Sequence, residues 1–511
     1  MSARVRADPG HRFSWRDVLA GLSVALVLIP QSVAYAELAG LPSHHGLYAA
    51  ALPPIAAAFF ASSPYLQTGP VALTALLTLG ALLPLAQTGS AEFVGLAALL
   101  ALVVGVVRML VGALKAGWLS YLMSRPMLNG FTSAAAILIV SSQLPSALGS
   151  AAPEGSVLGR AAWAIGHPAS WEAASIGLAG MTVFLVLGGR AIHALIPGVL
   201  IAAAGGLVLS SLSGYTGSTV GDIPAGLPML TLDLPWSRLP VLLLPGAVIA
   251  LVGFAEAASI ARAFASEDRQ RWDANREFLS QGAANLAAGL TSGFPVGGSF
   301  SRSSVNRLAG ARSRWSGLVT GAGVLLFLPF AGVLAPLPTA VLAGIVIAAV
   351  STLFRPRELL RLWALSRPQA VVGLGTFACT LLLAPHIEQA VLIGVVMAGA
   401  VHMWRELRPG VAARRDGDTL YLEPSGVLWF GSAPALEDAL LARLAEEPDV
   451  TRVVLNCSGL GRIDLTGAYG LAEMFEQVDR AGLEMEIEGV PEPARRTLEA
   501  AGVGTRTPPT S

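Results

Sequence analysis

The sequence predicts a polytopic α-helical membrane protein with fourteen spans in two inverted repeats of seven, followed by a small soluble α/β domain. Only 13% of the 511 residues are charged and 54% are hydrophobic, whereas soluble proteins carry roughly 25% charged residues. Apolar stretches of membrane-spanning length, about 20 residues, recur up to about His402. After Arg405 the composition becomes that of a soluble protein. We therefore expect an N-terminal segment 1–16, a membrane domain 17–405 and a C-terminal domain 412–504.

The candidate spans follow from hydrophobicity, and two of them are anomalous. The segment 69–84 begins within Gln67-Thr68-Gly69-Pro70, and the segment 299–309 is short, polar and preceded by Gly297-Gly298. Neither has the composition of a full, lipid-facing span. The fourteen predicted segments are 17–38, 46–61, 69–84, 91–114, 120–144, 172–189, 193–212, 240–263, 277–293, 299–309, 314–332, 336–354, 369–385 and 388–404.

The arginines indicate the orientation, because cytoplasmic loops carry an excess of Lys and Arg. With the basic N-terminus inside, alternate loops should be basic, and Arg108 with Lys115 and Arg190 are counted among these loop residues. The opposite loops, 145–171 and 213–239, carry few charges. The N-terminus has no signal-peptide cleavage site. We therefore expect both termini in the cytoplasm and a location in a bacterial inner membrane.

An internal repeat is indicated by the stretches 25–36 and 250–261, each of which begins Ala-Leu-Val. Each is followed about 35–45 residues later by one of the two anomalous segments. With seven spans per half, the second copy enters the membrane from the opposite side, which gives repeats of about 17–212 and 240–404. Short segments broken by Gly and Pro at matching places in inverted halves indicate a binding site near the membrane midplane.

The two anomalous segments predict an anion site. A helix that begins inside the membrane leaves its first N–H groups unpaired, which hydrocarbon tolerates only at a buried or wet site. Two such ends facing each other supply donors and about half a positive charge each. The alternative is a pair of interfacial loops or glycine-rich helix packing. The residues expected at the site are Thr68, Gly69, Val71, Ala72, Gly298, Ser299 and Ser301.

Polar residues inside the spans extend this site. Arg302 would add a positive charge and a planar donor fork, unless it pairs with Glu256 or marks the cytoplasmic end of its segment. Gln31 and Tyr35 are four residues apart on one helix face and can line one pocket. Glu256 stands in an otherwise apolar helix and is a candidate proton carrier, a static ion pair being the alternative. Glu37 is a second coupling candidate, with simple solvation as its alternative.

Beyond about Leu420 the pattern predicts alternating strands and helices, which is typical of a small α/β sandwich. Asp464 and Thr466 are placed to cap the second helix. The expected elements are two short strands within 421–430, a helix at 433–446, a strand at 452–457, a helix at 465–481, a strand at 484–488 and a helix at 492–501.

Three stretches resemble the sulfate permease (SulP) family of anion transporters: Pro30-Gln-Ser-Val-Ala-Tyr-Ala36, Thr68-Gly69-Pro70 and Gly298-Ser-Phe-Ser-Arg-Ser-Ser-Val-Asn306. The tail resembles a STAS domain, the module shared by sulfate transporters and anti-sigma factor antagonists. The resemblance implies a core domain and a gate domain that work as a homodimer by an elevator-like movement, with the anion between the starts of spans three and ten. The site residues that it implies are Gln31, Tyr35, Gly69, Val71, Ala72, Ser299, Ser301 and Arg302.

The resemblance also bears on coupling and regulation. Sodium-coupled bicarbonate relatives carry an Asp on span eight and a Thr four residues later, where this chain has Glu256 and Ile260. This difference favours a proton over sodium as the coupling ion. Thr466 occupies the place of a Ser that is phosphorylated in anti-sigma antagonists, which makes it a regulatory candidate.

The expected function is proton-coupled symport of a small anion across the bilayer, the anion being sulfate, bicarbonate or a dicarboxylate. The alternatives are anion exchange, channel-like anion conduction, nucleobase transport by the same fold, or a sensor that presents its C-terminal domain to a cytoplasmic protein partner. A net charge of zero gives no sign of a nucleic-acid partner. Without a nucleotide-binding loop, metal cluster or nucleophile constellation, the sequence predicts neither an enzyme nor a cofactor.

Overall fold

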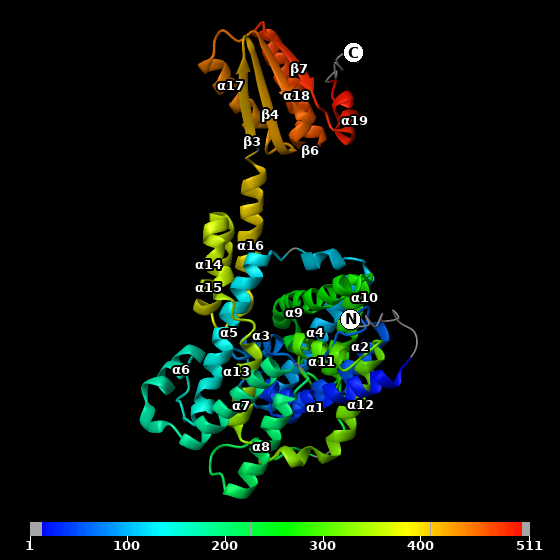
Figure 1. The fold of residues 1–511 in the computed structure, drawn as a ribbon, viewed down its shortest axis with the longest axis vertical. Helices are drawn as coiled ribbons and strands as arrows, with labels where there is room; N and C mark the ends of the chain where they lie inside the picture. The colour runs from blue at the N-terminus through cyan, green and yellow to red at the C-terminus, as the bar shows by residue number, and fades with distance from the viewer. Residues whose placement is uncertain (1–12, 122, 194, 225, 409, 503–511) are drawn as a thin grey trace. The chain divides into compact units, whose positions relative to one another are not determined.

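The computed structural model describes residues 13–121, 123–193, 195–224, 226–408 and 410–502. The chain divides into two compact units, Met1–Val396 and Met397–Ser511. The first unit is helical apart from two short strands, and the second combines strands and helices (Figure 1).

In the described part of the chain, fourteen helices coincide with the fourteen predicted spans, and α16 runs across the division between the units. Seven helices or helix–turn segments are apolar and long enough to cross a membrane alone. The shortest of the fourteen helices are α3 and α11, with 11 and 9 residues. The helices are α1 (Trp15–Leu38), α2 (His44–Phe60), α3 (Ala72–Leu82), α4 (Ala91–Ala113), α5 (Arg125–Leu148), α7 (Ala173–Ile192), α8 (Gly198–Ser213), α9 (Leu239–Asp268), α10 (Ala274–Leu290), α11 (Phe300–Leu308), α12 (Trp315–Phe327), α13 (Thr339–Val350), α15 (Arg367–Leu382) and α16 (Ile387–Glu406).

Local capping explains several of these helix boundaries. Ser14 forms a capping box with Asp17 at the start of α1, and Ser90 accepts a hydrogen bond from a first-turn N–H of α4. Ser124 does the same for α5, so this helix begins five residues later than predicted. Gly149 ends α5 in a left-handed conformation with φ of 66°. Two further helices, α6 (Val157–Gly166) and α14 (Pro356–Leu365), lie between spans and were not predicted.

The packing of the first unit repeats after seven spans. α4 packs against α9 and α10, and its counterpart α12 packs against α1 and α2, the counterparts of α9 and α10. Likewise α5 packs against α13 and α15, and α13 packs against α5 and α7. Two helix sets result: a core set of α1–α4 with α9–α12, and a flanking set of α5, α7, α8, α13, α15 and α16. In Figure 1, α1, α2, α11 and α12 lie together on one side of the unit, and α5, α7 and α13 on the other.

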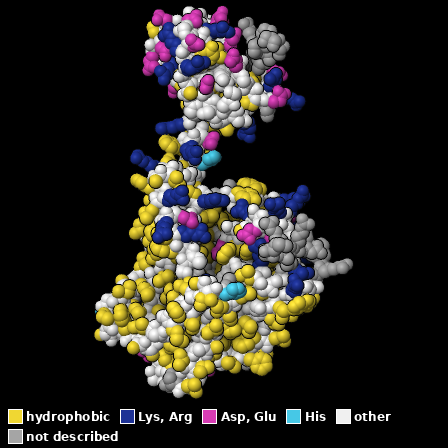
Figure 2. Space-filling view, in the orientation of Figure 1, with side chains coloured by type: hydrophobic (Ala, Val, Ile, Leu, Met, Phe, Trp, Pro, Cys, Tyr) yellow, Lys and Arg dark blue, Asp and Glu magenta, His cyan; other side chains and the backbone are white. Residues whose placement is uncertain are grey.

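The outer surface of the first unit is apolar. Leu212, Leu326 and Phe184 are 83%, 75% and 74% exposed, which is unfavourable in water but not against lipid. Hydrophobic side chains cover most of the face of this unit seen in Figure 2, and Lys and Arg side chains gather toward one edge. This is the distribution of a membrane-embedded surface with one basic rim.

The second unit contains a sheet with strand order β3-β4-β5-β7, and β6 also pairs with β4. β3 and β4 form an antiparallel hairpin, whereas β4–β5, β5–β7 and β4–β6 are parallel. The prediction of two short strands within 421–430 is wrong, because residues 421–428 belong to the single long strand β4, which ends there. The strand β3 was not predicted. The elements are β3 (Gly410–Asp416), β4 (Thr419–Leu428), α17 (Ala433–Glu446), β5 (Arg452–Asn456), β6 (Leu460–Ile463), α18 (Leu465–Arg480), β7 (Glu484–Glu488) and α19 (Glu492–Ala500).

Candidate functional site

Two short strands join the halves of the core set. β1 (Thr68–Gly69) directly precedes the start of α3, and β2 (Gly297–Gly298) directly precedes the start of α11. They pair antiparallel, with Thr68 opposite Gly298 and Gly69 opposite Gly297, and all four residues are buried. The pairing satisfies backbone groups of non-helical chain inside the protein, where an unpaired N–H or C=O would be costly.

Buried polar side chains hold this strand pair in place. The Gln281 amide on α10 donates to Thr68 Oγ1 at 2.7 Å. One turn further along α10, Asn285 binds both backbone groups of Val296, accepting from its N–H at 3.0 Å and donating to its carbonyl at 3.1 Å. The Thr68 hydroxyl therefore anchors β1 to α10. The Asn285 side chain anchors Val296, the residue directly before β2, to the same helix.

Arg108 is buried inside the first unit and does not lie in a loop. It lies on α4 with no exposed surface, and its guanidinium donates to the carbonyls of Ala250, Val296 and Ile249 at 3.0, 2.9 and 3.3 Å. The prediction that it belongs to a basic cytoplasmic loop is wrong. Its donors instead link α4, α9 and the chain before β2, which are the elements around the strand pair.

The starts of α3 and α11 provide free backbone donors, because the first N–H groups of a helix have no partner within it. Val71 precedes α3 in an extended conformation, and no side chain caps this helix. Ser299 precedes α11, and its hydroxyl accepts only weakly from Arg302 N–H at 3.4 Å. Both helices thus begin inside the unit with the positive ends of their dipoles beside β1 and β2.

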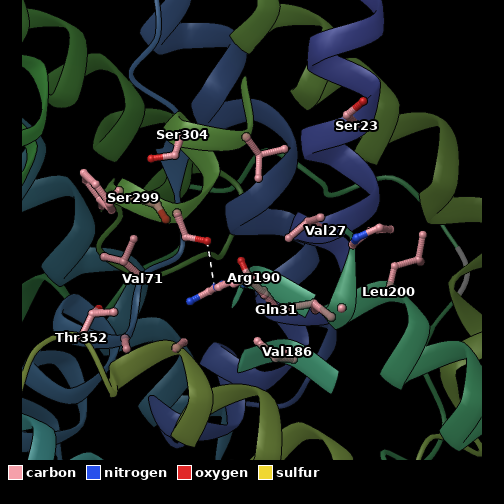
Figure 3. A pocket seen from close by; sticks show the side chains of 18 of the residues that line it. Ser23, Val27, Gln31, Val71, Val186, Arg190, Leu200, Ser299, Ser304 and Thr352 are labelled. Carbon is pink, nitrogen blue, oxygen red and sulfur yellow. Dashed lines mark hydrogen bonds between the residues drawn. The ribbon is translucent and has the colours of Figure 1, made fainter. Parts of the chain in front are cut away.

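A cavity of about 680 Å³ lies beside the two helix starts. Figure 3 shows Val71 and Ser299 on one side of it and Gln31 and Val27 on another, with Arg190 reaching between them. Residues of both helix sets line the wall, so the cavity lies at their boundary. The predicted site residues that line it are Gln31, Tyr35, Val71, Ala72, Glu256, Ser299 and Ser301.

Other predicted residues lie outside the cavity wall. Thr68, Gly69 and Gly298 form the strand pair behind it. Glu37 is far along α1, next to the loop before α2, where Glu37 Oε1 accepts from the Ser43 hydroxyl at 3.2 Å. The structure therefore brings Glu37 to a local hydrogen bond and not to the site.

Arg302 stands one side chain behind the cavity wall. It is fully buried, and its NH1 donates to Gln31 Oε1 at 3.3 Å. Its Nε and NH2 have no hydrogen-bond partner among the described residues. A Cβ placed on Gly69 would lie 3.5 Å from Arg302 NH2, so the guanidinium lies against β1. A buried charge with two unused donors is costly, and an anion in the cavity would reduce that cost.

Glu256 lines the cavity from α9 and is half-buried. Within the described part of the chain, no ion pair joins its carboxylate to Arg302 or to any other base. The carboxylate and the Arg302 guanidinium still attract each other electrostatically, without direct contact. Glu256 is therefore a carboxylate that faces the cavity and is not held in a contact ion pair.

Arg190 is a cavity residue that sequence reasoning missed. It lies in the last turn of α7, and its NH2 donates to Ser301 Oγ at 2.9 Å. The bond joins the flanking set to the core set. Its place after Gly188 and Gly189 at the end of a span suggested a loop arginine, whereas α7 continues through it to Ile192.

In the second unit, Asp464 caps α18 by accepting from Gly467 N–H at 2.6 Å. Thr466 lies in the first turn of the same helix with its side chain exposed. Its regulatory role stays a prediction, and its exposure would give a kinase access.

Comparison with known proteins establishes the family. The model described as "Sulfate permease family" matches residues 15–376, which is more than half of the chain. This chain belongs to the sulfate permease family. The model of the STAS domain matches residues 411–508. The predicted fold class, a polytopic helical membrane protein with a C-terminal STAS domain, is confirmed.

Relatives of this chain are named as transporters in several kingdoms. A "Probable sulfate transporter" of Mycobacterium tuberculosis is 33% identical over 95% of this chain and 91% of its own length. "Probable sulfate transporter 4.2" of Arabidopsis thaliana is 31% identical over 98% of this chain and 79% of its own. The "Sodium-independent sulfate anion transporter" of Bos taurus is 30% identical over 95% and 85%. These names support a transporter and not an enzyme.

Solved structures share the fold of this chain. The murine Solute Carrier 26 family member A9 anion transporter in the inward-facing state superposes with a TM-score of 0.86 at 19% identity, over 96% of this chain and 89% of its own. The transmembrane domain of a cyanobacterium bicarbonate transporter, BicA, gives a TM-score of 0.65 at 26% identity, over 76% of this chain and 98% of its own.

Proposed function

We propose that this protein is a secondary active transporter that holds a small anion between the starts of α3 and α11. The observation that carries the proposal is the convergence of two uncapped or weakly capped helix starts on one cavity, with the buried and incompletely bonded guanidinium of Arg302 behind it. Backbone N–H groups, hydroxyls and a nearby fixed charge are the donors that oxyanions bind. The proposed ligands are Gln31, Tyr35, Val71, Ala72, Ser299 and Ser301, positioned by Thr68, Gly69, Gly298 and Arg302.

Sulfate is the first candidate substrate, because the relatives that cover most of this chain are named sulfate transporters. Bicarbonate is the second, since BicA shares the fold and is named a bicarbonate transporter. A dicarboxylate is the third. Nucleobase transport, which the same architecture could support, is disfavoured because an uncharged substrate would not compensate the buried charge of Arg302.

We further propose that Glu256 couples transport to protons. Its carboxylate faces the cavity and forms no contact ion pair within the described residues, so it can take up a proton when the anion binds. Sodium is disfavoured, because Ile260, one turn further along α9, offers no oxygen ligand. Glu37 has no part in this proposal, since it lies away from the cavity.

The transport step proposed here is an elevator movement of the core set against the flanking set. The cavity lies at the boundary of the two sets, so a shift between them would change its access. We propose a transport domain at 17–405 and a STAS domain at 412–504. Both termini would lie in the cytoplasm of a bacterium, and the protein would be a homodimer. The STAS domain is the proposed contact for a cytoplasmic protein.

The proposal is tested by pH-gradient-driven uptake of labelled sulfate, bicarbonate and a dicarboxylate into proteoliposomes. The parent should show saturable uptake of one anion that rises with an inward proton gradient. Arg302→Ala should reduce uptake about tenfold or more, because a charge-assisted donor is lost. Glu256→Gln should transport without a response to the gradient.

Matched controls separate function from folding. Glu37→Gln changes the same chemical group outside the cavity, and Arg357→Ala removes an exposed arginine of α14; both should behave as the parent. Size-exclusion profiles check that each variant is folded. If the parent moves an anion without a pH response, exchange or channel-like conduction replaces symport, and normal uptake by Arg302→Ala would refute the site.

A further inference from the structure

Arg190 approaches the proposed anion position from the opposite helix set. It is carried by α7 of the flanking set, whereas Ser301 is carried by α11 of the core set, and the hydrogen bond between them is 2.9 Å long. Both side chains line the cavity. Figure 3 shows the guanidinium extending into the cavity toward the start of α11, with Ser299 and Gln31 on either side of it.

The positive charge of Arg190 is not neutralised by a carboxylate among the described residues, so it can attract an anion in the cavity. Among the described residues, no carboxylate forms an ion pair with it. Its recorded side-chain partner is the neutral hydroxyl of Ser301, which a ligand oxygen can replace. A half-buried guanidinium that faces a cavity and holds only a hydroxyl has a planar donor fork to offer to an oxyanion.

The charges around the cavity suggest which anion fits. Arg190 and Glu256 line the wall, and Arg302 lies directly behind Gln31. With Glu256 ionised, these three groups sum to one positive charge, which balances a monovalent anion. With Glu256 protonated, they sum to two positive charges, which balance a divalent anion. The second arginine therefore allows a dianion and a proton to be held together without excess charge.

We propose that Arg190 is a direct ligand of the transported anion and makes the site select doubly charged oxyanions over singly charged ones. This inference rests on the proposed anion site. Arg302 supplies positive charge from behind the wall, and Arg190 supplies the charge that touches the ligand from the flanking set. Because Arg190 and the helix starts belong to different sets, the anion bridges the two sets in this conformation.

The test compares anions of one shape and different charge. Sulfate and selenate are tetrahedral dianions, and perchlorate is a tetrahedral monoanion of similar size. The measurement is labelled sulfate uptake into proteoliposomes, with KM for sulfate and the inhibition constants of selenate and perchlorate. In Arg190→Gln, which keeps an N–H donor for Ser301, KM for sulfate and the selenate constant should rise about 10- to 100-fold, as for loss of one charge-assisted hydrogen bond. The perchlorate constant should change less than about threefold.

Arg190→Lys keeps the charge and should retain most of the preference for dianions, whereas Arg357→Gln on α14 should leave all constants unchanged. An unchanged ratio of sulfate to perchlorate affinity in Arg190→Gln would overturn the inference. If Arg302→Ala loses uptake while Arg190→Gln keeps the parent's ratio, the anion site stands and only this inference falls. If the parent transports no anion, the proposed function and this inference fall together.

Discussion

At the scale of single residues, the site depends on side chains that never reach the cavity. Arg108, Gln281 and Asn285 bind backbone and side-chain groups around β1 and β2, and Arg302 acts on the cavity through Gln31. In a low-dielectric interior, such hydrogen bonds fix geometry, and the removal of one member leaves another polar group unpaired. The residues that we propose to bind the anion are therefore distinct from those that position them.

Gly298 shows how little space the strand pair has. A Cβ on this residue would lie 3.0 Å from Ala257 Cβ and 2.9 Å from Leu66 Cδ1, and also 3.1 Å from the α9 backbone at Ala257 Cα. We expect Gly298→Ala to lower stability by about 1–3 kcal/mol through overpacking and to impair uptake. Gly177→Ala is the matched control, because a Cβ there meets no atom within 4 Å. Thermal unfolding in detergent measures both, and equal melting temperatures would contradict the close packing of α9 on β2.

At the scale of elements, much of the membrane unit could be predicted from apolar length, and the short helices α3 and α11 from the Gly and Pro residues that precede them. The charged residues could not be placed in the same way. Counting loop arginines assumes that an arginine near a span end faces water, yet Arg108 is buried against carbonyls and Arg190 lines the cavity. Only tertiary packing distinguishes these cases, because the local pattern of an apolar run followed by a base is the same.

The hairpin of the second unit was missed for a related reason. β3 (Gly410–Asp416) is an edge strand with most of its residues exposed, and its apolar face consists only of Val411 and Ala413, which is too short a pattern to predict a strand. The turn to β4 uses Gly417 with φ of 63°, a conformation that glycine adopts readily. The buried strand β5 and the helix starts capped by Asp464 were readable because burial and capping leave clear local patterns.

Burial within the second unit has a chemical consequence at Cys457, which directly follows β5. Removal from water raises the pKa of this thiol to about 12, against an ordinary value of 9.0. At pH 8 the reactive thiolate is then roughly a thousandfold rarer, so we expect Cys457 to resist maleimide until the domain unfolds. Peptide mapping by mass spectrometry measures the label, and Ser458→Cys, an exposed neighbour, should react at once.

Rapid labelling of Cys457 in the folded chain would show that the sheet core is open. The same pKa shift also affects stability. Because the folded thiol is held in its protonated form, its contribution to stability is complete below about pH 9 and is lost as the pH rises toward 12.

At the scale of the whole membrane unit, each half packs its apolar helices against the other half. The main contacts of α4 and α12 are with helices of the opposite half, so neither half buries its apolar faces alone. We expect a chain carrying a protease site in the loop between α8 and α9 to stay assembled and active after cleavage. Co-elution of the two fragments and sulfate uptake measure this. Separation of the fragments in mild detergent would contradict the interleaved packing.

The pairing of β1 with β2 also has a consequence for the folding of the chain during its synthesis. Thr68 and its partner Gly298 are about 230 residues apart. At roughly 5–20 residues per second, synthesis of the intervening chain takes on the order of 10 to 50 s. During that time the half-helix α3 and the polar backbone before it have no partner strand, and lipid cannot satisfy them. Until the second half is made, these backbone groups need water or another protein as their hydrogen-bond partner.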